Sequence, residues 1–215
     1  MKEELSGVVR AARRLAEEGL VSGTWGNLSI RLGKGSIAIT PRGRALEKLR
    51  TEDLVLVDLR GGWRGSTAPS TELRLHLEIY RAREDVNAVI HIHSPFACAA
   101  AVAGMRIPPV LEELAQLVGG SVEVAEYAPP GTEELARNAV RALGSKNAVL
   151  LSNHGAVCTG RSLGEALLTC EVVERGAKVF AFAKLLGQPR VLDEDEVQLL
   201  SRMYRRYSME SERDI

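Results

Sequence analysis

The chain has 215 residues and 45% of them are hydrophobic, so it is long enough to bury a large core and fits one domain, 1–215, better than two. Basic and acidic residues balance at 28 each, so bulk charge gives no indication of a nucleic-acid or membrane partner. No apolar run approaches the roughly 20 residues of a membrane span and no apolar signal core follows Met1, so we expect a globular, cytoplasmic protein.

The first third of the chain predicts one helix and several short strands. Apolar residues recur at helical spacing from Leu5 to Ala16, and Gly19 is a natural stop for that helix. The segment 22–30 interleaves glycines with small polar residues just before a strand, so it is either an ordinary turn or a phosphate cradle. Strands are expected over 36–40 and 53–59, which indicates a hairpin-like, partly antiparallel sheet.

A helix is expected to begin within the segment Pro69-Ser70-Thr71-Glu72. Ser70 or Thr71 suits the N-cap position, and a glutamate in the first turn suits the helix dipole. The same N-terminus, with free N–H groups and two hydroxyls, is also a ready anion site. The sequence leaves both interpretations of this segment open.

The rest of the chain alternates strands with helices. The predicted elements are a strand ending at His93, a helix from Pro95 to Gly104, a helical turn from Glu112 and Glu113, a strand over 122–127, a helix over 132–143, a strand over 148–151, a long helix from Ser162 to about Leu186 and a last helix from Asp193 to Tyr207. This alternation predicts an α/β fold in layers, with a mixed sheet covered by helices on both faces. The three cysteines, widely spaced in apolar surroundings, fit buried free thiols.

Three of the four histidines close apolar strands. His91 and His93 are one residue apart, so they point to the same face of their strand. His154 follows the apolar run 148–151 and can join them if its strand lies beside the first. Three nitrogen ligands with one open position are typical of catalytic zinc, although Co²⁺, Mn²⁺ or Ni²⁺ accept the same ligands. The fourth histidine, His76, is assigned to packing or to support of the site.

Five short motifs together resemble the class II aldolase/adducin family. They are Ser22-Gly-Thr-Trp-Gly-Asn27, Thr40-Pro-Arg-Gly43, Pro69-Ser-Thr-Glu72, His91-Ile-His93 and Asn153-His-Gly155. The resemblance covers nearly the whole chain and is strongest to the L-fuculose-1-phosphate aldolase branch. It implies a mixed, largely antiparallel sheet between helices, one Zn²⁺ per subunit, and a homotetramer with active sites at the subunit interfaces.

The same resemblance implies the metal and catalytic residues. His91, His93 and His154 match the zinc ligands. Glu72 matches a carboxylate that contacts the metal in the resting site and then acts as general acid/base. Tyr207 matches a C-terminal tyrosine that reaches into the neighbouring subunit's site.

The resemblance also implies a site for the substrate phosphate. The matching residues are Gly26, Asn27, Gly43, Ser70 and Thr71. Arg42 stands where the family aldolase has threonine, and it either contacts the phosphate in a bidentate way or points to solvent.

The implied activity is zinc-dependent cleavage of a phosphorylated ketose, a ketose 1-phosphate like L-fuculose 1-phosphate. The products are dihydroxyacetone phosphate and a hydroxyaldehyde, formed through a metal-stabilised enediolate. Glu112 stands where the aldolase has a tyrosine, so either Glu112 or Glu113 is an acid/base group, as in a methylthioribulose-1-phosphate dehydratase, or both are ordinary first-turn glutamates. A pentulose-phosphate 4-epimerase, which has aspartate at the position of Glu72, and a non-enzymatic adducin-like module, which lacks the ligands, fit less well.

Overall fold

One seven-stranded sheet forms the centre of the molecule, with strand order β3-β2-β1-β4-β7-β6-β5. The computed structural model describes residues 1–33 and 35–211. The strands are β1 (Asn27–Leu32), β2 (Ser36–Ile39), β3 (Val55–Asp58), β4 (Ala88–Ile92), β5 (Glu123–Ala125), β6 (Ala148–Leu151) and β7 (Gly155–Gly160). Only β5 and β6 pair in parallel, and every other neighbouring pair is antiparallel. The predicted mixed, largely antiparallel sheet is therefore confirmed.

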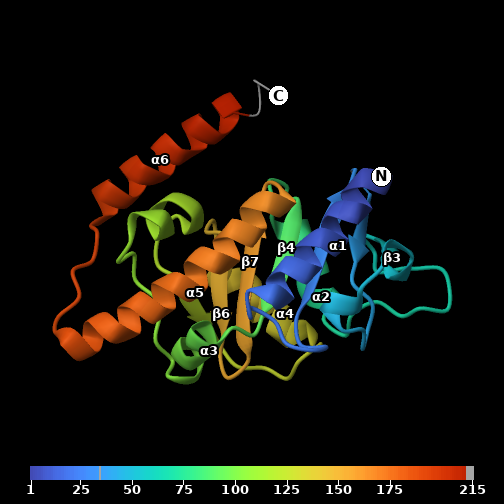
Figure 1. Cartoon of the computed structure of the whole chain (residues 1–215), viewed down its shortest axis with the longest axis horizontal. Coiled ribbons are helices and arrows are strands. Elements are labelled where there is room, and N and C mark those ends of the chain that lie inside the picture. Colours follow the sequence, from blue (N-terminus) through green and yellow to red (C-terminus); the bar gives the residue numbers. More distant parts are fainter. Residues whose placement is uncertain (34, 212–215) are drawn as a thin grey trace.

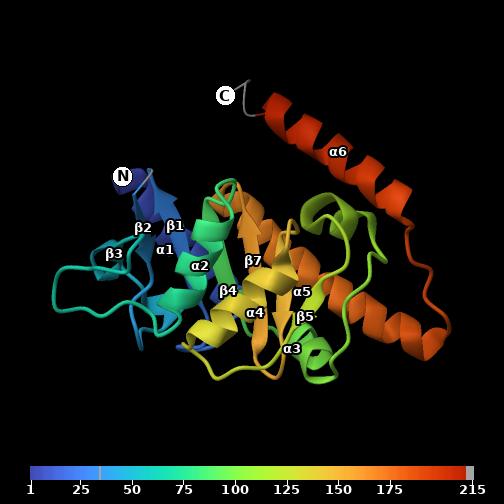
Figure 2. The ribbon, with the colours of Figure 1, turned by 180° about the vertical axis from the view of Figure 1, so that it is seen from behind.

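Helices cover both faces of this sheet (Figures 1 and 2). They are α1 (Lys2–Glu17), α2 (Leu73–Ala82), α3 (Pro95–Val102), α4 (Glu133–Leu143), α5 (Leu163–Leu186) and α6 (Glu194–Ser211), with a π-helical turn η3 (Leu114–Val118) and the 3-10 turns η1 (Leu46–Lys48) and η2 (Thr51–Asp53). Helices α1 and α5 lie across the face seen in Figure 1, and α2 and α4 lie across the face seen in Figure 2. In the described part of the chain, no helix is both long and apolar enough to cross a bilayer.

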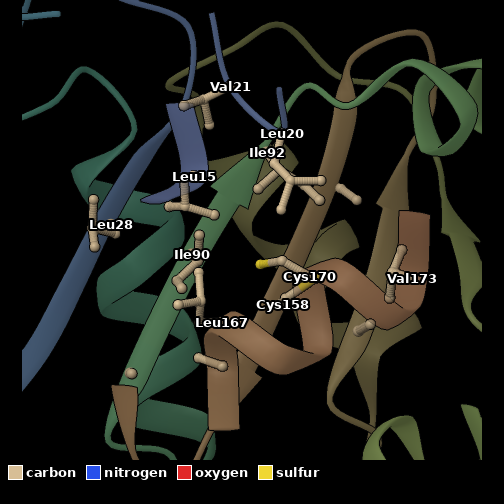
Figure 3. Close-up of a cluster of buried hydrophobic side chains, with 14 of the residues drawn as sticks. Leu15, Leu20, Val21, Leu28, Ile90, Ile92, Cys158, Leu167, Cys170 and Val173 are labelled. Atoms are coloured by element: carbon tan, nitrogen blue, oxygen red, sulfur yellow. The ribbon is translucent and has the colours of Figure 1, made fainter. Parts of the chain in front are cut away.

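The α1 and α5 face carries the larger of two hydrophobic cores (Figure 3). Ile90 and Ile92 of β4 point into it, and both are fully buried. Leu15 of α1 and Cys170 of α5 are packed in the same cluster. Alternation along β4 therefore sends the intervening residue, His91, to the opposite face.

That opposite face packs against α2 and α4 in a second core. Val89 and Val157, from the neighbouring strands β4 and β7, belong to it, and so do Ile79 and Tyr80 of α2. The strands that carry the functional side chains described below are packed on both faces, because each face of the sheet has its own hydrophobic core.

Two details of the fold differ from the sequence predictions. The strand before His154 does not lie beside β4, because β7, which the sequence analysis did not identify, pairs with both β4 and β6. Helix α2 begins at Leu73 with Glu72 at the N-cap position, so neither Ser70 nor Thr71 is the cap residue. The Ser70 hydroxyl instead accepts a hydrogen bond from the Glu72 backbone N–H at 3.2 Å.

Candidate metal and phosphate site

Strand β4 delivers the first two histidines at its C-terminal end. The His91 side chain is fully buried, and its Nδ1 lies 2.9 Å from the carbonyl oxygen of Ala156. A carbonyl oxygen only accepts, so Nδ1 carries the proton and Nε2 keeps a free lone pair. That Nε2 lies 2.8 Å from Nε2 of His93, so the two rings do converge on one point as the alternation predicted.

The hairpin between β6 and β7 brings His154 to the same point. Its turn includes Asn153 at a φ of 55°, a left-handed conformation that asparagine tolerates better than most residues. Gly155 follows, and a Cβ there would lie 2.4 Å from the carbonyl oxygen of Ile92. The absence of a side chain at Gly155 is thus what lets this hairpin pack directly against β4.

The three histidines lie together, and two of them contact the carboxylate of Glu72. One ring nitrogen of each of His91, His93 and His154 lies within 4.8 Å of the others. Glu72 Oε2 lies 3.1 Å from His91 Nε2, and Oε1 lies 3.5 Å from His154 Nε2. Oε1 is buried and has no hydrogen-bond partner among the described residues.

Burial and neighbouring charge set the ionisation of this group. Burial raises the pKa of Glu72, but attraction to His91 and a hydrogen bond from Asn27 outweigh it, so the pKa lies below its ordinary value. Burial, reinforced by repulsion from the other two rings, lowers the pKa of His93 to about 3. Burial also lowers the pKa of His154. The site therefore favours an ionised Glu72 carboxylate beside neutral His93 and His154 rings.

These residues fit a divalent transition metal. Metal binding requires neutral imidazoles, and both His93 and His154 are held in that form. The tautomer of His91 leaves a nitrogen available, and Oε1 of Glu72 is buried without a hydrogen bond from any described residue. Three nitrogens and one carboxylate oxygen form a donor set of the catalytic zinc type.

A cavity of about 260 Å³ opens beside these residues and joins them to the predicted phosphate site. Its lining residues are Thr24, Trp25, Gly26, Asn27, Pro41, Arg42, Gly43, Ser70, Thr71, Glu72, His93, Pro130 and His154. Among the described residues that line it, Arg42 is the single arginine or lysine. All six residues predicted to bind phosphate therefore lie around the same cavity as the metal site.

The loops around this cavity are fastened to one another. Pro41 and Pro69 form an isolated β-bridge, and the backbone N–H of Ser70 donates to the carbonyl oxygen of Thr40 at 3.0 Å. Gly26 has a φ of 105°, and a Cβ there would lie 2.9 Å from the carbonyl oxygen of His91. Only glycine therefore lets the loop that carries Asn27 approach the histidine strand so closely.

The sequence did not predict how Asn27 and His76 are used. The Asn27 side chain donates a hydrogen bond to Glu72 Oε2 at 2.9 Å and meets His76 Nε2 at 2.5 Å. His76 is buried and lies outside the three-histidine cluster. Ser29 and Tyr80, which extend this contact, gave no signal in the sequence because both occupy ordinary core positions.

Glu112 and Tyr207 do not line the cavity formed by this chain. Glu112 is exposed just before η3, and Tyr207 is 72% exposed on α6. Glu113 forms an ion pair with Arg175 at 3.4 Å. The roles predicted for Glu112 and Tyr207 therefore require a contribution from another subunit, as the resemblance implied for Tyr207.

One known protein family matches most of this chain. The model of the family described as "Class II Aldolase and Adducin N-terminal domain" matches residues 6–181. The chain belongs to this family. The class II aldolase fold, with helices around one mixed sheet, is confirmed by solved structures of the same kind.

Individual relatives of this class II aldolase-family protein are aldolases, which are carbon–carbon lyases. It is 38% identical to the 5-methylthioribulose-1-phosphate/5-deoxyribulose-1-phosphate aldolase of Rhodospirillum rubrum over 94% of this chain and 90% of the relative. It is 34% identical to the 5-deoxy-D-ribulose 1-phosphate aldolase of Bacillus thuringiensis over 98% of this chain and 99% of the relative. The expected class of enzyme is therefore confirmed at the level of the family.

A solved structure supports the same conclusion. An L-fuculose 1-phosphate aldolase superimposes with a TM-score of 0.91 at 36% identity, covering 94% of this chain and 96% of the other. Class II aldolases use a divalent metal, and in this chain the group of His91, His93 and His154 can hold one.

Proposed function

We propose that the protein is a zinc-dependent aldolase that cleaves a ketose 1-phosphate into dihydroxyacetone phosphate and an aldehyde. The observation that carries this proposal is the single cavity that joins Glu72 and two of the histidines to Arg42, Ser70 and Thr71. One part of it can hold a metal and the other can hold a phosphate, which are the two anchors that a short phosphorylated ketose offers.

Zn²⁺, when bound by His91, His93 and His154, supplies a Lewis acid for the carbonyl and adjacent hydroxyl oxygens of the ketose. The protein's own groups orient the substrate and move protons. Cleavage of the C3–C4 bond removes a proton from the C4 hydroxyl, leaves the electron pair on the C3 side, and returns a proton to C3. Glu72, whose Oε1 accepts no hydrogen bond from the described residues, is the group in the cavity placed to move the proton at C3.

The phosphate is assigned to the loop side of the cavity. Arg42 provides charge, the Ser70 and Thr71 hydroxyls lie just before α2, and Gly26 and Gly43 allow the substrate to approach the backbone. The positive end of the α2 dipole favours an anion at this place.

Two candidate substrates have the same chemical form. The relatives from Rhodospirillum and Bacillus are named for 5-deoxyribulose 1-phosphate, and the solved structure is named for L-fuculose 1-phosphate. Both ketose phosphates carry phosphate at one end and a methyl group at the other. Trp25 and Pro130, which also line the cavity, supply apolar surface for such an end.

The deciding experiment is an assay of the zinc-loaded protein with both of these substrates and with methylthioribulose 1-phosphate, with products identified. Dihydroxyacetone phosphate formed with a matching aldehyde supports the proposal. Loss of water without carbon–carbon cleavage would instead identify a dehydratase. A homotetramer that brings Glu112 and Tyr207 to a neighbour's cavity is part of the proposal, and its mass in solution tests it.

A further inference from the structure

Two buried polar side chains of α2 neither line the cavity nor belong to the three-histidine group. His76 and Tyr80 lie one turn apart, and their exposed fractions are 0% and 1%. They face Ser29 of β1, which is also fully buried. Burying three polar side chains together is unfavourable unless each is hydrogen-bonded, so their contacts need an explanation.

These side chains form a continuous line of hydrogen bonds that ends at Glu72. The Tyr80 hydroxyl lies 2.9 Å from Ser29 Oγ, and Ser29 Oγ lies 2.7 Å from His76 Nδ1. His76 Nε2 lies 2.5 Å from Asn27 Oδ1. The Asn27 amide nitrogen lies 2.9 Å from Glu72 Oε2.

The chemistry of each group gives the line one direction. An ionised carboxylate only accepts, so the Asn27 NH₂ group faces Glu72 and its carbonyl oxygen faces His76. That oxygen also only accepts, so the His76 proton is on Nε2. A neutral His76 then accepts at Nδ1 from the Ser29 hydroxyl. The Tyr80 hydroxyl lies beside that oxygen and donates to the backbone carbonyl oxygen of Ser29 at 3.0 Å.

We propose that His76 is a positioning residue: its Nε2–H fixes which way the Asn27 amide faces and thereby directs a donated hydrogen bond at the Glu72 carboxylate. The inference deepens the proposed function, because it rests on Glu72 as the group that moves the proton. Burial holds the pKa of His76 near 3, which keeps the ring neutral as this arrangement requires.

The contact matters because the amide of Asn27 has two possible orientations. With a donor at His76, the carbonyl oxygen of Asn27 is held away from the carboxylate. Without that donor the amide can rotate, and its oxygen would then face the negative charge of Glu72. The carboxylate would lose its hydrogen bond and its fixed position beside His91 and His154.

The test compares two substitutions at one position. His76→Gln can still donate to Asn27, whereas His76→Leu fills the space without a donor. We expect His76→Leu to lower kcat about 10- to 100-fold with KM and bound zinc little changed, because outer partners of metal-site groups typically act on this scale. His76→Gln is expected to restore most of kcat. Equal kcat values in the two variants would overturn the proposal.

A double-mutant cycle separates positioning from packing. If His76 acts through Glu72, then His76→Leu has little further effect on kcat in a Glu72→Gln background. Fully additive losses would mean that His76 only supports the fold. If His76→Leu fails to fold, Ser29→Ala tests the same line and is expected to lower kcat in the same direction by a smaller factor, and an unchanged kcat counts against it.

A measurement that needs no activity distinguishes failure of this inference from failure of the proposed function. Long-range proton–nitrogen NMR of the histidine-labelled protein reports the tautomer of each ring, and the His76 signal is assigned by its loss in His76→Gln. A neutral ring protonated on Nε2 supports the proposal, and one protonated on Nδ1 overturns it, whichever substrate the protein cleaves.

Discussion

The two sides of the cavity are built in different ways. The histidine side, lined by His93 and His154 with His91 buried behind them, comes from the end of β4 and from the hairpin that follows β6, and each strand is held by paired neighbours. The loop side is formed by Arg42 and Gly43, by Ser70 and Thr71, and by Gly26. The first two loops meet at the Pro41–Pro69 bridge, and the turn of Gly26 lies against the His91 carbonyl oxygen. Core packing fixes the positions of side chains on a sheet, whereas loop sequences tolerate substitution. The histidine side therefore suits the catalytic groups, and the loop side suits residues that determine substrate specificity.

Loss of the carboxylate on the histidine side is expected to have the largest effect. Glu72→Gln keeps the size of the side chain but removes its charge and its ability to move a proton. We expect kcat to fall on the order of 100-fold to 10,000-fold, while zinc remains bound to the three histidines. Steady-state kinetics with metal analysis checks this. Near-normal cleavage by Glu72→Gln would contradict the role given to the carboxylate.

On the loop side, Arg42→Ala is expected to act on substrate binding. Loss of a charged hydrogen bond to phosphate should raise KM about tenfold or more, with a smaller change in kcat. Arg44→Ala is the matched control, because Arg44 lies two residues away and pairs with Asp53 at 3.0 Å. If both variants raise KM equally, Arg42 does not hold the phosphate.

Gly155→Ala tests how strictly the histidine side is packed. The added Cβ would meet the Ile92 carbonyl oxygen at 2.4 Å and His91 Cε1 at 3.1 Å, so β7 and β4 must separate. We expect a loss of about 1 to 3 kcal/mol in the free energy of unfolding together with weaker zinc binding. Gly43→Ala on the loop side is the control, since no atom lies within 4 Å of its added Cβ, although its φ of 69° adds local strain. Unchanged zinc affinity in Gly155→Ala would show that the hairpin can adjust.

The burial of His76 should affect the pH dependence of stability. Burial lowers the pKa of His76 from its ordinary 6.5 to about 3, so between these values the unfolded chain binds a proton that the folded chain does not. The contribution of His76 to the free energy of unfolding therefore falls as pH falls through this window, by on the order of 2 kcal/mol at pH 5, and His93 and His154 add falls of the same sign. Urea denaturation of the metal-free protein at pH 7.5 and 5 measures this, and His76→Gln should show a smaller decrease. An equal decrease in both proteins would assign the effect to other groups.

The smallest effect is expected at the turn that carries the third histidine. Asn153→Ala places a less tolerant residue at a φ of 55° and should destabilise the protein by about 1 kcal/mol. Asn153→Gly removes that strain and should be close to neutral. Thermal denaturation of the two variants compares them directly, and equal melting temperatures would show that the turn conformation contributes little.

Sequence patterns predicted the histidine side better than its surroundings. Alternation along β4 is a local property, so the shared direction of His91 and His93 could be derived from their spacing alone. The position of β7 between β4 and β6 depends on pairing between distant segments, which no local pattern encodes. The capping prediction at Ser70 was wrong because the chain turns at Thr71 and Glu72 before α2 begins.

The arrangement of the loop side, and the hydrogen bonds that link Asn27 to Glu72 and His76, could be seen only in the structure. The family motifs placed Gly26, Arg42 and Ser70 near a phosphate, and the structure gathers them around one cavity. The contacts of Asn27 with Glu72 and His76 join residues more than 40 positions apart. Polar residues at such buried positions look like ordinary core residues until their partners are known.

The position of β7 also bears on when the protein can first take up its metal. His91 meets its backbone partner Ala156 across 65 residues of sequence, and His154 reaches the other rings only when the β6–β7 hairpin has docked on β4. Contacts of such long range form late, after the entropy of closing the intervening loop has been overcome. A nascent chain that has exposed only His91 and His93 therefore has an incomplete site, and ion capture follows assembly of the sheet. Once bound, the ion would slow the opening of the hairpin that completed its site.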